Sequence, residues 1–436
     1  MLITTSKFSK IILANLIIAL IFIAIVIPGI IYDKSNSFQA IDQNYYHLPQ
    51  VEIFVKDSMD FGKLYPSKTA TTPGYHLALS WVAKTFNHGQ ADANAFPVRL
   101  VNALFGLGLL LSVWWLIYLG GNNNIANSTY LVLPFLFSYQ FLGSSIWVMT
   151  DNASLLWVTL TLLLLILPIS LNRDHWTLSL AGIFASLAVF YRQTHIWLIV
   201  PTLLRLLKSS TKQFNGWLYL LALLPACLVL GYFLALWHGL LPPEFVSEHI
   251  SKSKQINWTV LPFVSSLFAI FSLFYTGYLV RELKEIKASE LYGMLIISLI
   301  IGLSLAILFP SNYDKAAGRY GGWLWILVKS LPTVQDRSIL FLFLSPLGTV
   351  LMSLWYKVTT FNKNSNDLLI LFSMIAWTIV GTSSMRTYQR YYEPLILITL
   401  AFLASRQMQY SKKSYLGSLI LTGLMATISL QQILLE

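Results

Sequence analysis

The sequence predicts an all-α polytopic membrane protein, and two properties of its composition predict this class. Charged residues make up only 11% of the 436 residues, whereas soluble domains usually contain roughly 25%. Hydrophobic residues make up 56%. Apolar runs of roughly 17 to 25 residues, which is the length of a membrane-spanning helix, recur from one end of the chain to the other.

These runs predict about 13 transmembrane helices. They lie at residues 10–31, 100–119, 128–148, 152–170, 176–191, 193–207, 216–238, 257–280, 290–309, 338–356, 367–384, 391–406 and 414–433. The connections are too short for a separate soluble domain, so we expect one integral-membrane domain over residues 1–436. Within it we distinguish a long first external loop (32–98), a following group of helices (100–250) and a C-terminal group (251–436).

Basic residues in the short loops predict the orientation of the chain in the membrane. If the N-terminus with Lys7 and Lys10 is cytoplasmic and the spans alternate, the cytoplasmic side carries 14 basic and 5 acidic residues. The opposite side then carries 15 basic and 13 acidic residues. The net charge of +11 therefore indicates this bias and contact with anionic membrane lipids. No nucleic-acid-binding motif is present, and we expect no nucleic-acid partner.

The first external loop is predicted to contain two interfacial helices. The first follows Asp42, with apolar residues at the helical spacing of Val51, Phe54 and Val55. The second begins after the sequence TTPG, with Pro73 near its first turn. We expect both helices to lie at the membrane surface rather than to cross it.

Polar residues gather at other predicted borders on the external side. Charged groups at membrane depth are costly and usually face a cavity or a partner, and arginine with aromatic residues suits phosphates and sugar faces. These borders therefore indicate a site for an anionic, polyhydroxylated ligand. The candidate residues outside the first loop are Asp151, Arg192, Gln193, His195, His249, Arg386, Arg390 and Glu393. No metal-binding, Walker or dinucleotide-binding pattern is present, so we expect no metal ion and no required cofactor.

Six stretches of the sequence, taken in chain order, resemble the motifs of a known family. They are YYHLPQ, TATTPGYHLALS, FPVRLVN, VMTDNASLLWVTL, AVFYRQTHIWLIVP and RYYEPLILITL. They resemble the motifs of the dolichyl-phosphate-glucose alpha-1,2-glucosyltransferases, to which WHGLLPPEFVSEH adds a similar Trp-to-His spacing. The resemblance covers most of the first 250 residues and one later stretch. It implies the GT-C fold of membrane glycosyltransferases. We favour a distant or bacterial relative of the family over a member of its eukaryotic branch.

The resemblance also implies roles for the candidate residues. An acid in the first loop would deprotonate the acceptor hydroxyl, and Asp42 is our first candidate for this base. In an ungapped alignment on His47, however, the family's acidic pair falls on Gln43 and Asn44, so Asp42 takes this role with one inserted residue. Asp151 is the second candidate for the base, and a role as a helix cap is an equal alternative for it.

The remaining candidates would bind substrate. Arg192, together with Arg390 or Arg386, would hold the donor phosphate. His195 stands where the family has asparagine. The predicted substrate-binding residues are His47, Gln50, Arg192, Gln193, His195, His249, Arg386, Arg390 and Glu393.

Together these features predict an inverting glycosyltransferase, specifically a hexosyltransferase with glucose as the favoured sugar. Its donor would be a polyprenyl-phosphate sugar, and its acceptor a lipid-linked glycan or another external acceptor. The enzyme would lie in a bacterial plasma membrane, or in the ER membrane if eukaryotic, with its active site on the non-cytoplasmic face. A lipid-linked oligosaccharide flippase is one alternative, but the sequence shows no clear internal repeat. An oligosaccharide polymerase is another, but its large external loop is expected late in the chain, and here the longest loop comes first.

Overall fold

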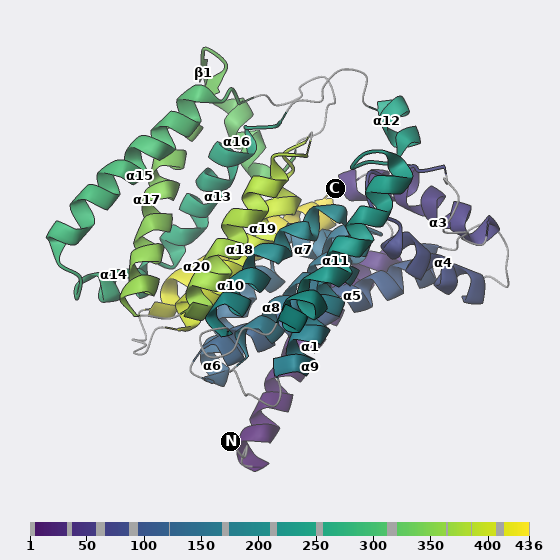
Figure 1. Cartoon of the computed structure of the whole chain (residues 1–436), viewed down its shortest axis with the longest axis horizontal. Coiled ribbons are helices and arrows are strands. Elements are labelled where there is room, and N and C mark those ends of the chain that lie inside the picture. The colour runs from purple at the N-terminus through teal and green to yellow at the C-terminus, as the bar shows by residue number, and fades with distance from the viewer. Residues whose placement is uncertain are drawn as a thin grey trace. The chain divides into compact units, whose positions relative to one another are not determined.

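Helices make up most of the chain in the computed structural model shown in Figure 1. The structure describes residues 5–32, 37–57, 66–86, 95–121, 123–167, 174–209, 216–249, 256–311, 321–362, 365–384, 386–406 and 414–435. Within these ranges the strands are limited to one hairpin, formed by β1 (Thr333–Val334) and β2 (Arg337–Ser338). The predicted all-α class is therefore confirmed.

Six of the described helices are long and apolar enough to cross a membrane. They are α1 (Thr5–Tyr32), α5 (Ala95–Gly120), α11 (Gly216–Trp237), α15 (Ala288–Leu308), α17 (Ile339–Phe361) and α20 (Ser414–Leu435). The number rises to eight if each of two bent helix pairs forms one span. The protein is therefore a multi-pass membrane protein, but the predicted number of about 13 spans is not confirmed.

Three of the predicted spans are broken into shorter helices. The run at 128–148 forms α6 (Ile125–Leu136) and α7 (Tyr139–Ile146), and the run at 257–280 forms α13 (Val260–Phe274) and α14 (Thr276–Leu283). The run at 193–207 begins as the 3₁₀ helix η2 (Gln193–Leu198) and continues as α10 (Ile199–Ser209). Hydropathy alone did not reveal these breaks, because one or two residues at a break change the mean hydropathy of a long apolar run very little.

The chain divides into two compact units. The first unit comprises Met1–Leu116, Phe141–Ser253 and Ile428–Glu436, and the second comprises Ile117–Gln140 and Lys254–Thr427. The first loop and most of the candidate site residues belong to the first unit.

The first loop forms the two helical regions that the sequence predicts. The first region is a continuous series of α2 (Phe38–Asp42), the π-helical turn η1 (Gln43–His47) and α3 (Leu48–Lys56). Val51, Phe54 and Val55 are buried along α3 as expected. The second region is α4 (Gly74–Phe86), which begins directly after Pro73.

The apolar core of the first unit joins these loop helices to the bundle. Residues of α3, α4 and α5 pack there against α8 (Thr150–Ile166) and α9 (Asp174–Tyr191), and Figure 1 shows α9 running beside α11. Gly74 allows the close approach of α4 to α9, because a Cβ at this position would lie 2.6 Å from the carbonyl oxygen of Phe190. The glycine of the TTPG sequence is therefore needed for the packing of α4 on α9.

The second unit is built around α13, α17 and α19 (Gln389–Ser405). Helix α17 packs between α13 and α15, while α18 (Ser365–Gly381) and α6 pack on α19. Beside the β hairpin lies the short helix α16 (Trp323–Ser330), as Figure 1 shows. The hairpin turn places Gln335 and Asp336 at φ 49° and 61°, which is the backbone conformation of a type I′ turn.

Candidate functional site

The first-loop acid lies at a π-helical turn. Asp42 ends α2 and is 7% exposed, and the amide N–H of Leu48 donates to the carbonyl oxygen of Gln43 across the widened turn. A π-helical turn contains more residues than an α-helical turn and often occurs at functional sites.

Gln43 connects this turn to the bundle. Its Oε1 accepts hydrogen bonds of 3.0 Å from both Arg99 Nε and the amide of Val148. The guanidinium of Arg99 also lies 4.3 Å from the centre of the Trp147 ring. Gln43 is fully buried, so its amide has a positioning role that the motif comparison did not suggest.

Asn102 holds the sharp bend between α7 and α8, two helices that meet at 113°. Its Nδ2 donates to the carbonyl oxygens of Ser144, Ser145 and Trp147 at 2.8 to 3.1 Å. Its Oδ1 accepts a 2.7 Å hydrogen bond from the hydroxyl of Tyr75. These bonds satisfy carbonyl groups that the end of α7 would otherwise leave unpaired.

Tyr75 remains a hydrogen-bond donor at physiological pH. Burial, and then the nearby charge of Asp151, raise the pKa of Tyr75 well above its usual value. The phenol therefore keeps the proton that it donates to Asn102. Through this bond, helix α4 of the first loop supports the bend that precedes Asp151.

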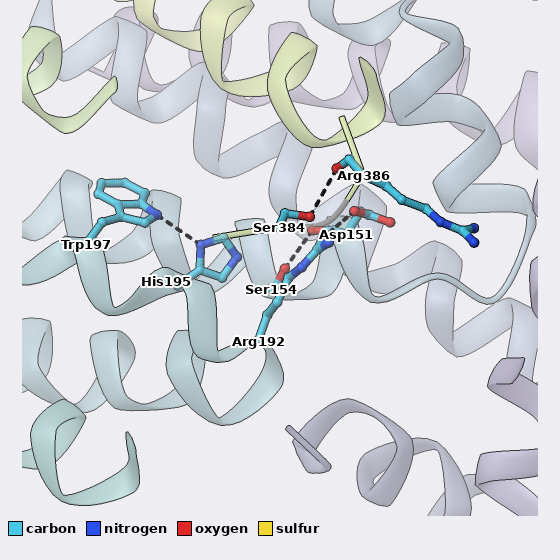
Figure 2. A network of polar contacts seen from close by, with 7 residues as sticks. All are labelled: Asp151, Ser154, Arg192, His195, Trp197, Ser384 and Arg386. Carbon is cyan, nitrogen blue, oxygen red and sulfur yellow. Dashed lines mark hydrogen bonds and ion pairs between the residues drawn. The ribbon is translucent and has the colours of Figure 1, made fainter. Parts of the chain in front are cut away.

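Asp151 and Arg192 form an ion pair. Asp151 lies in the first turn of α8, where a negative charge is favourable, and Arg192 lies between α9 and η2. Arg192 Nη1 lies 2.5 Å from Asp151 Oδ1, and the side chains are 15% and 10% exposed respectively. Figure 2 shows the guanidinium directed at the carboxylate. The N-cap of α8 is Met149 rather than Asp151, whose side chain binds Arg192 instead.

Gln193 binds backbone groups of two loops. Its Oε1 accepts from the amide of Thr72, and its Nε2 donates to the carbonyl oxygens of Ala70 and Leu240. Gln50 has similar bonds, because its Oε1 accepts from the amide of Lys68. Within the described residues both amides therefore stabilise the first loop, and direct substrate binding by either one remains a prediction.

His47 pairs with a second histidine in the first loop. Its Nδ1 lies 2.9 Å from His76 Nε2, and the two rings stack with their centres 5.2 Å apart. Burial and the neighbouring His47 lower the pKa of His76 well below its usual value. His76 is therefore neutral at physiological pH, and the histidine pair links α4 to the turn that carries Asp42.

The remaining candidate of the first unit lies at the end of the short helix α12 (Pro243–His249). The side chain of His249 lies outside the described residues. Glu244 on the same helix accepts a 3.1 Å hydrogen bond from the amide of Ser67 through its Oε2. The substrate-binding role of His249 therefore remains a prediction.

Three candidates belong to the second unit. Arg386 is exposed and donates to the hydroxyl of Tyr388, and Arg390 lies over the rings of Tyr388 and Tyr391. Figure 2 also draws the hydrogen bond from Ser384 to the backbone of Arg386. Both arginines therefore pack against aromatic rings of the same segment.

Glu393 has a different environment from these arginines. It is 1% exposed, and its carboxylate accepts hydrogen bonds from Ser138, Trp323 and Gln389. These three donors give Glu393 a structural role inside the second unit, and substrate binding by Glu393 remains a prediction.

Several residues that complete this site are not among the candidates predicted from the sequence. Gln43, Thr72, Tyr75, His76, Arg99 and Asn102 all form the contacts described above. All of them except Gln43 lie in the quoted motif stretches, and Gln43 lies two residues before one. Their positions inside the motifs were therefore an available signal. Among the described residues no three histidine, cysteine, aspartate or glutamate side chains are grouped to hold a metal ion.

Comparisons with known proteins identify distant structural similarities. No protein-family model matches the sequence, and no curated protein matches it. The structure of ArnT from Cupriavidus metallidurans bound to undecaprenyl phosphate is similar at a TM-score of 0.49 and 13% identity. That match covers 98% of this chain and 64% of the ArnT chain.

A second structure, the oligosaccharyltransferase of Archaeoglobus fulgidus in the apo form, is also similar. It has a TM-score of 0.39 and 13% identity, and the match covers 92% of this chain and 57% of that one. This chain therefore spans less than two thirds of the length of either protein. At these scores the similarities do not establish the fold or the activity of this chain.

Proposed function

We propose that this protein is an integral-membrane inverting glycosyltransferase of the GT-C type. It would transfer a hexose, with glucose favoured, from a polyprenyl-phosphate donor to a lipid-linked glycan or another external acceptor. One observation carries the proposal: five of the six motif stretches, which are separated along the chain, join in one polar network of the first unit. The bonds of Asn102 to Tyr75 and of Arg192 to Asp151 are two of its links.

In the proposed reaction, the acceptor hydroxyl attacks the anomeric carbon of the donor sugar from the side opposite the phosphate. A new carbon–oxygen bond forms, the bond between the anomeric carbon and the phosphate oxygen breaks, and its electron pair leaves with polyprenyl phosphate. The hydroxyl proton passes to a carboxylate acting as general base. Asp42 is our first candidate for this role, because the family resemblance places the base in the first loop, and Asp151, whose carboxylate binds Arg192, is the second.

The leaving phosphate requires a positive group nearby. Arg192 remains our first candidate, because a guanidinium has five N–H donors and can bind a phosphate oxygen while one nitrogen holds Asp151. The ion pair would keep the guanidinium oriented before the donor binds. Arg386 and Arg390 are the alternative candidates for the same role.

Incubation of the purified protein with a panel of polyprenyl-phosphate sugars tests this proposal. We expect one donor to release polyprenyl phosphate in the presence of a lipid-linked acceptor, with the sugar recovered on the acceptor at inverted configuration. Asp42→Asn serves as the inactive control. A flippase would instead move a lipid-linked glycan across vesicle membranes without releasing polyprenyl phosphate, and that result would contradict the proposal.

The proposal also assigns a membrane and a face to the reaction. Membrane insertion places a polyprenyl donor within reach of the protein, and the positive-inside rule places the first loop on the non-cytoplasmic side. A bacterial plasma membrane is the favoured location, with the ER membrane as the eukaryotic equivalent.

A further inference from the structure

His195 lies in η2, three residues after Arg192. Its amide donates a 3.0 Å hydrogen bond to the carbonyl oxygen of Arg192. Arg192 is the N-cap of η2, in an extended backbone conformation. The imidazole of His195 is 5% exposed, so it is a buried polar ring in the first turn after Arg192.

Trp197 determines which nitrogen of His195 carries the proton. The indole Nε1 donates to His195 Nδ1 at 3.3 Å, and the two ring centres lie 6.3 Å apart. An indole N–H can only donate, so Nδ1 must be the acceptor. An imidazole protonated on both nitrogens would place two donors against each other. The ring is therefore neutral, with its single proton on Nε2.

The resulting Nε2–H group has no hydrogen-bond partner within the described part of the chain, and the atom is buried. A buried donor without an acceptor destabilises the fold, so such groups are rare unless a ligand or water completes them. In Figure 2 the second ring nitrogen of His195 points away from Trp197. This nitrogen is therefore a buried donor with a fixed direction and no hydrogen-bond acceptor among the described residues.

We propose that His195 donates its Nε2–H to a phosphate oxygen of the polyprenyl-phosphate donor, and that Trp197 is a positioning residue that fixes the required tautomer. The identity of this phosphate rests on the proposed function, whereas the tautomer assignment does not. When the bond to the anomeric carbon breaks, negative charge increases on the phosphate. A fixed N–H donor in a buried site therefore binds the phosphate of the transition state more tightly than the phosphate of the bound substrate. His195 would therefore act as a donor and not as a base.

Three substitutions separate the hydrogen-bond donor of His195 from the effect of Trp197 on its tautomer. In His195→Gln the side-chain amide nitrogen can occupy nearly the position of the histidine Nε2, and it carries protons whatever Trp197 does. His195→Phe keeps a ring and has no donor. Trp197→Phe keeps a ring and removes the indole N–H, so both histidine tautomers become accessible.

The experiment measures binding of polyprenyl phosphate and of inorganic phosphate to the purified full chain, together with donor kcat/KM. We expect His195→Phe to lower both the lipid affinity and kcat/KM by roughly ten- to a hundredfold, and His195→Gln to recover most of this loss. Trp197→Phe should lower them by roughly three- to tenfold in the native background. In the His195→Gln background it should have no further effect, because glutamine has no tautomer to fix.

Two results would overturn the proposal. Unchanged affinity of His195→Phe for both phosphates would remove His195 from the phosphate site. An equal loss from Trp197→Phe in the two backgrounds would show that Trp197 only packs against the helix. The ¹⁵N spectrum of histidine-labelled protein gives an independent readout, since the signal missing in His195→Gln identifies His195 among the seven histidines. If no donor releases polyprenyl phosphate, the proposed function fails, while this spectrum still decides whether Nε2 carries the proton.

Discussion

The guanidinium of Arg192 binds the carboxylate of Asp151 across 41 positions of sequence, with 2.5 Å between Nη1 and Oδ1. Because of this bond, two residues that the sequence predicted for separate roles form one ion pair. Asp151 offsets the charge of Arg192 and orients its guanidinium. The chemical behaviour of either residue should therefore depend on the other.

Arg192→Lys should impair donor use more than the preserved charge suggests. An ammonium can replace the contact with Asp151, but it lacks the planar set of donors that can bind Asp151 and a phosphate oxygen together. The loss of one charged hydrogen bond costs about 1.5 to 3 kcal/mol, or roughly ten- to more than a hundredfold in donor kcat/KM. Donor titrations of the two proteins test this. Equal kinetics would leave Arg386 and Arg390 as the phosphate candidates.

Asp42→Asn should leave the protein folded and reduce transfer by about 10² to 10⁴, the range expected for loss of a general base. The substitution preserves the size of the side chain at the π-helical turn and removes its ability to accept a proton. Turnover and the thermal unfolding temperature are measured together, with Asp57→Asn as the matched control on the exposed end of the same helical region. Turnover close to that of the control would exclude Asp42 as the base.

Asn102→Asp should be more destabilising than Tyr75→Phe. The aspartate would place a carboxylate against the carbonyl oxygens of Ser144, Ser145 and Trp147, which now accept hydrogen bonds from Asn102. Tyr75→Phe removes the bond to Asn102 and the backbone hydrogen bond of Met149 to the hydroxyl, and losses of this kind cost about 1 to 3 kcal/mol when the partner stays buried. Thermal unfolding ranks the two variants. The reverse order would mean that Asn102 does not hold the bend before α8.

Stability should decrease as the pH falls below about 6.5, partly because of His76. Its pKa is well below the usual value of 6.5 in the folded protein, through burial and then through His47. In the window below 6.5 and above the folded pKa, the unfolded chain binds the proton and the folded chain does not. Protonation therefore favours unfolding by up to about 1.4 kcal/mol per pH unit. Unfolding of the wild type and His76→Gln at pH 7.5 and 5.5 measures this, and the variant should lose less stability. An identical pH dependence would contradict it.

Single-cysteine labelling should place the first loop and the loop after α14 on opposite sides of the membrane. Cys227 is the single cysteine of the sequence, so Cys227→Ala provides the background. Lys56 and Lys287 are both exposed and are suitable positions for new cysteines. An impermeant reagent added outside cells should label Lys56→Cys and spare Lys287→Cys. The opposite pattern would reverse the proposed orientation.

Local patterns explain what the sequence predicted correctly. The composition and length of the apolar runs predicted a multi-pass helical protein, because a membrane span must be long and apolar whatever its neighbours are. The spacing of Val51, Phe54 and Val55 predicted the first-loop helix, because this spacing defines one helical face. The TTPG sequence predicted the start of α4, because proline is favoured at the beginning of a helix.

The site residues were only partly predictable. The motif comparison pointed to Arg192 and Asp151 but assigned them to different roles, since sequence spacing does not show which side chains meet. Gln50 and Gln193 looked like ligand-binding amides, yet their described bonds go to backbone groups. Gln43 aligned with the family's acidic pair when no gap was allowed, but nothing in the sequence indicated that its amide would bind Arg99 and Val148.

The sequence by itself determined the class of the protein, the existence of helices in the first loop and the stretches from which the site is built. These features depend on hydropathy and on residues a few positions apart. Only the tertiary structure decided that Asn102 holds the bend before Asp151, that Asp151 pairs with Arg192 and that Trp197 fixes the tautomer of His195. The first two depend on contacts between helices distant in sequence, and all three depend on side-chain directions, which no linear pattern specifies.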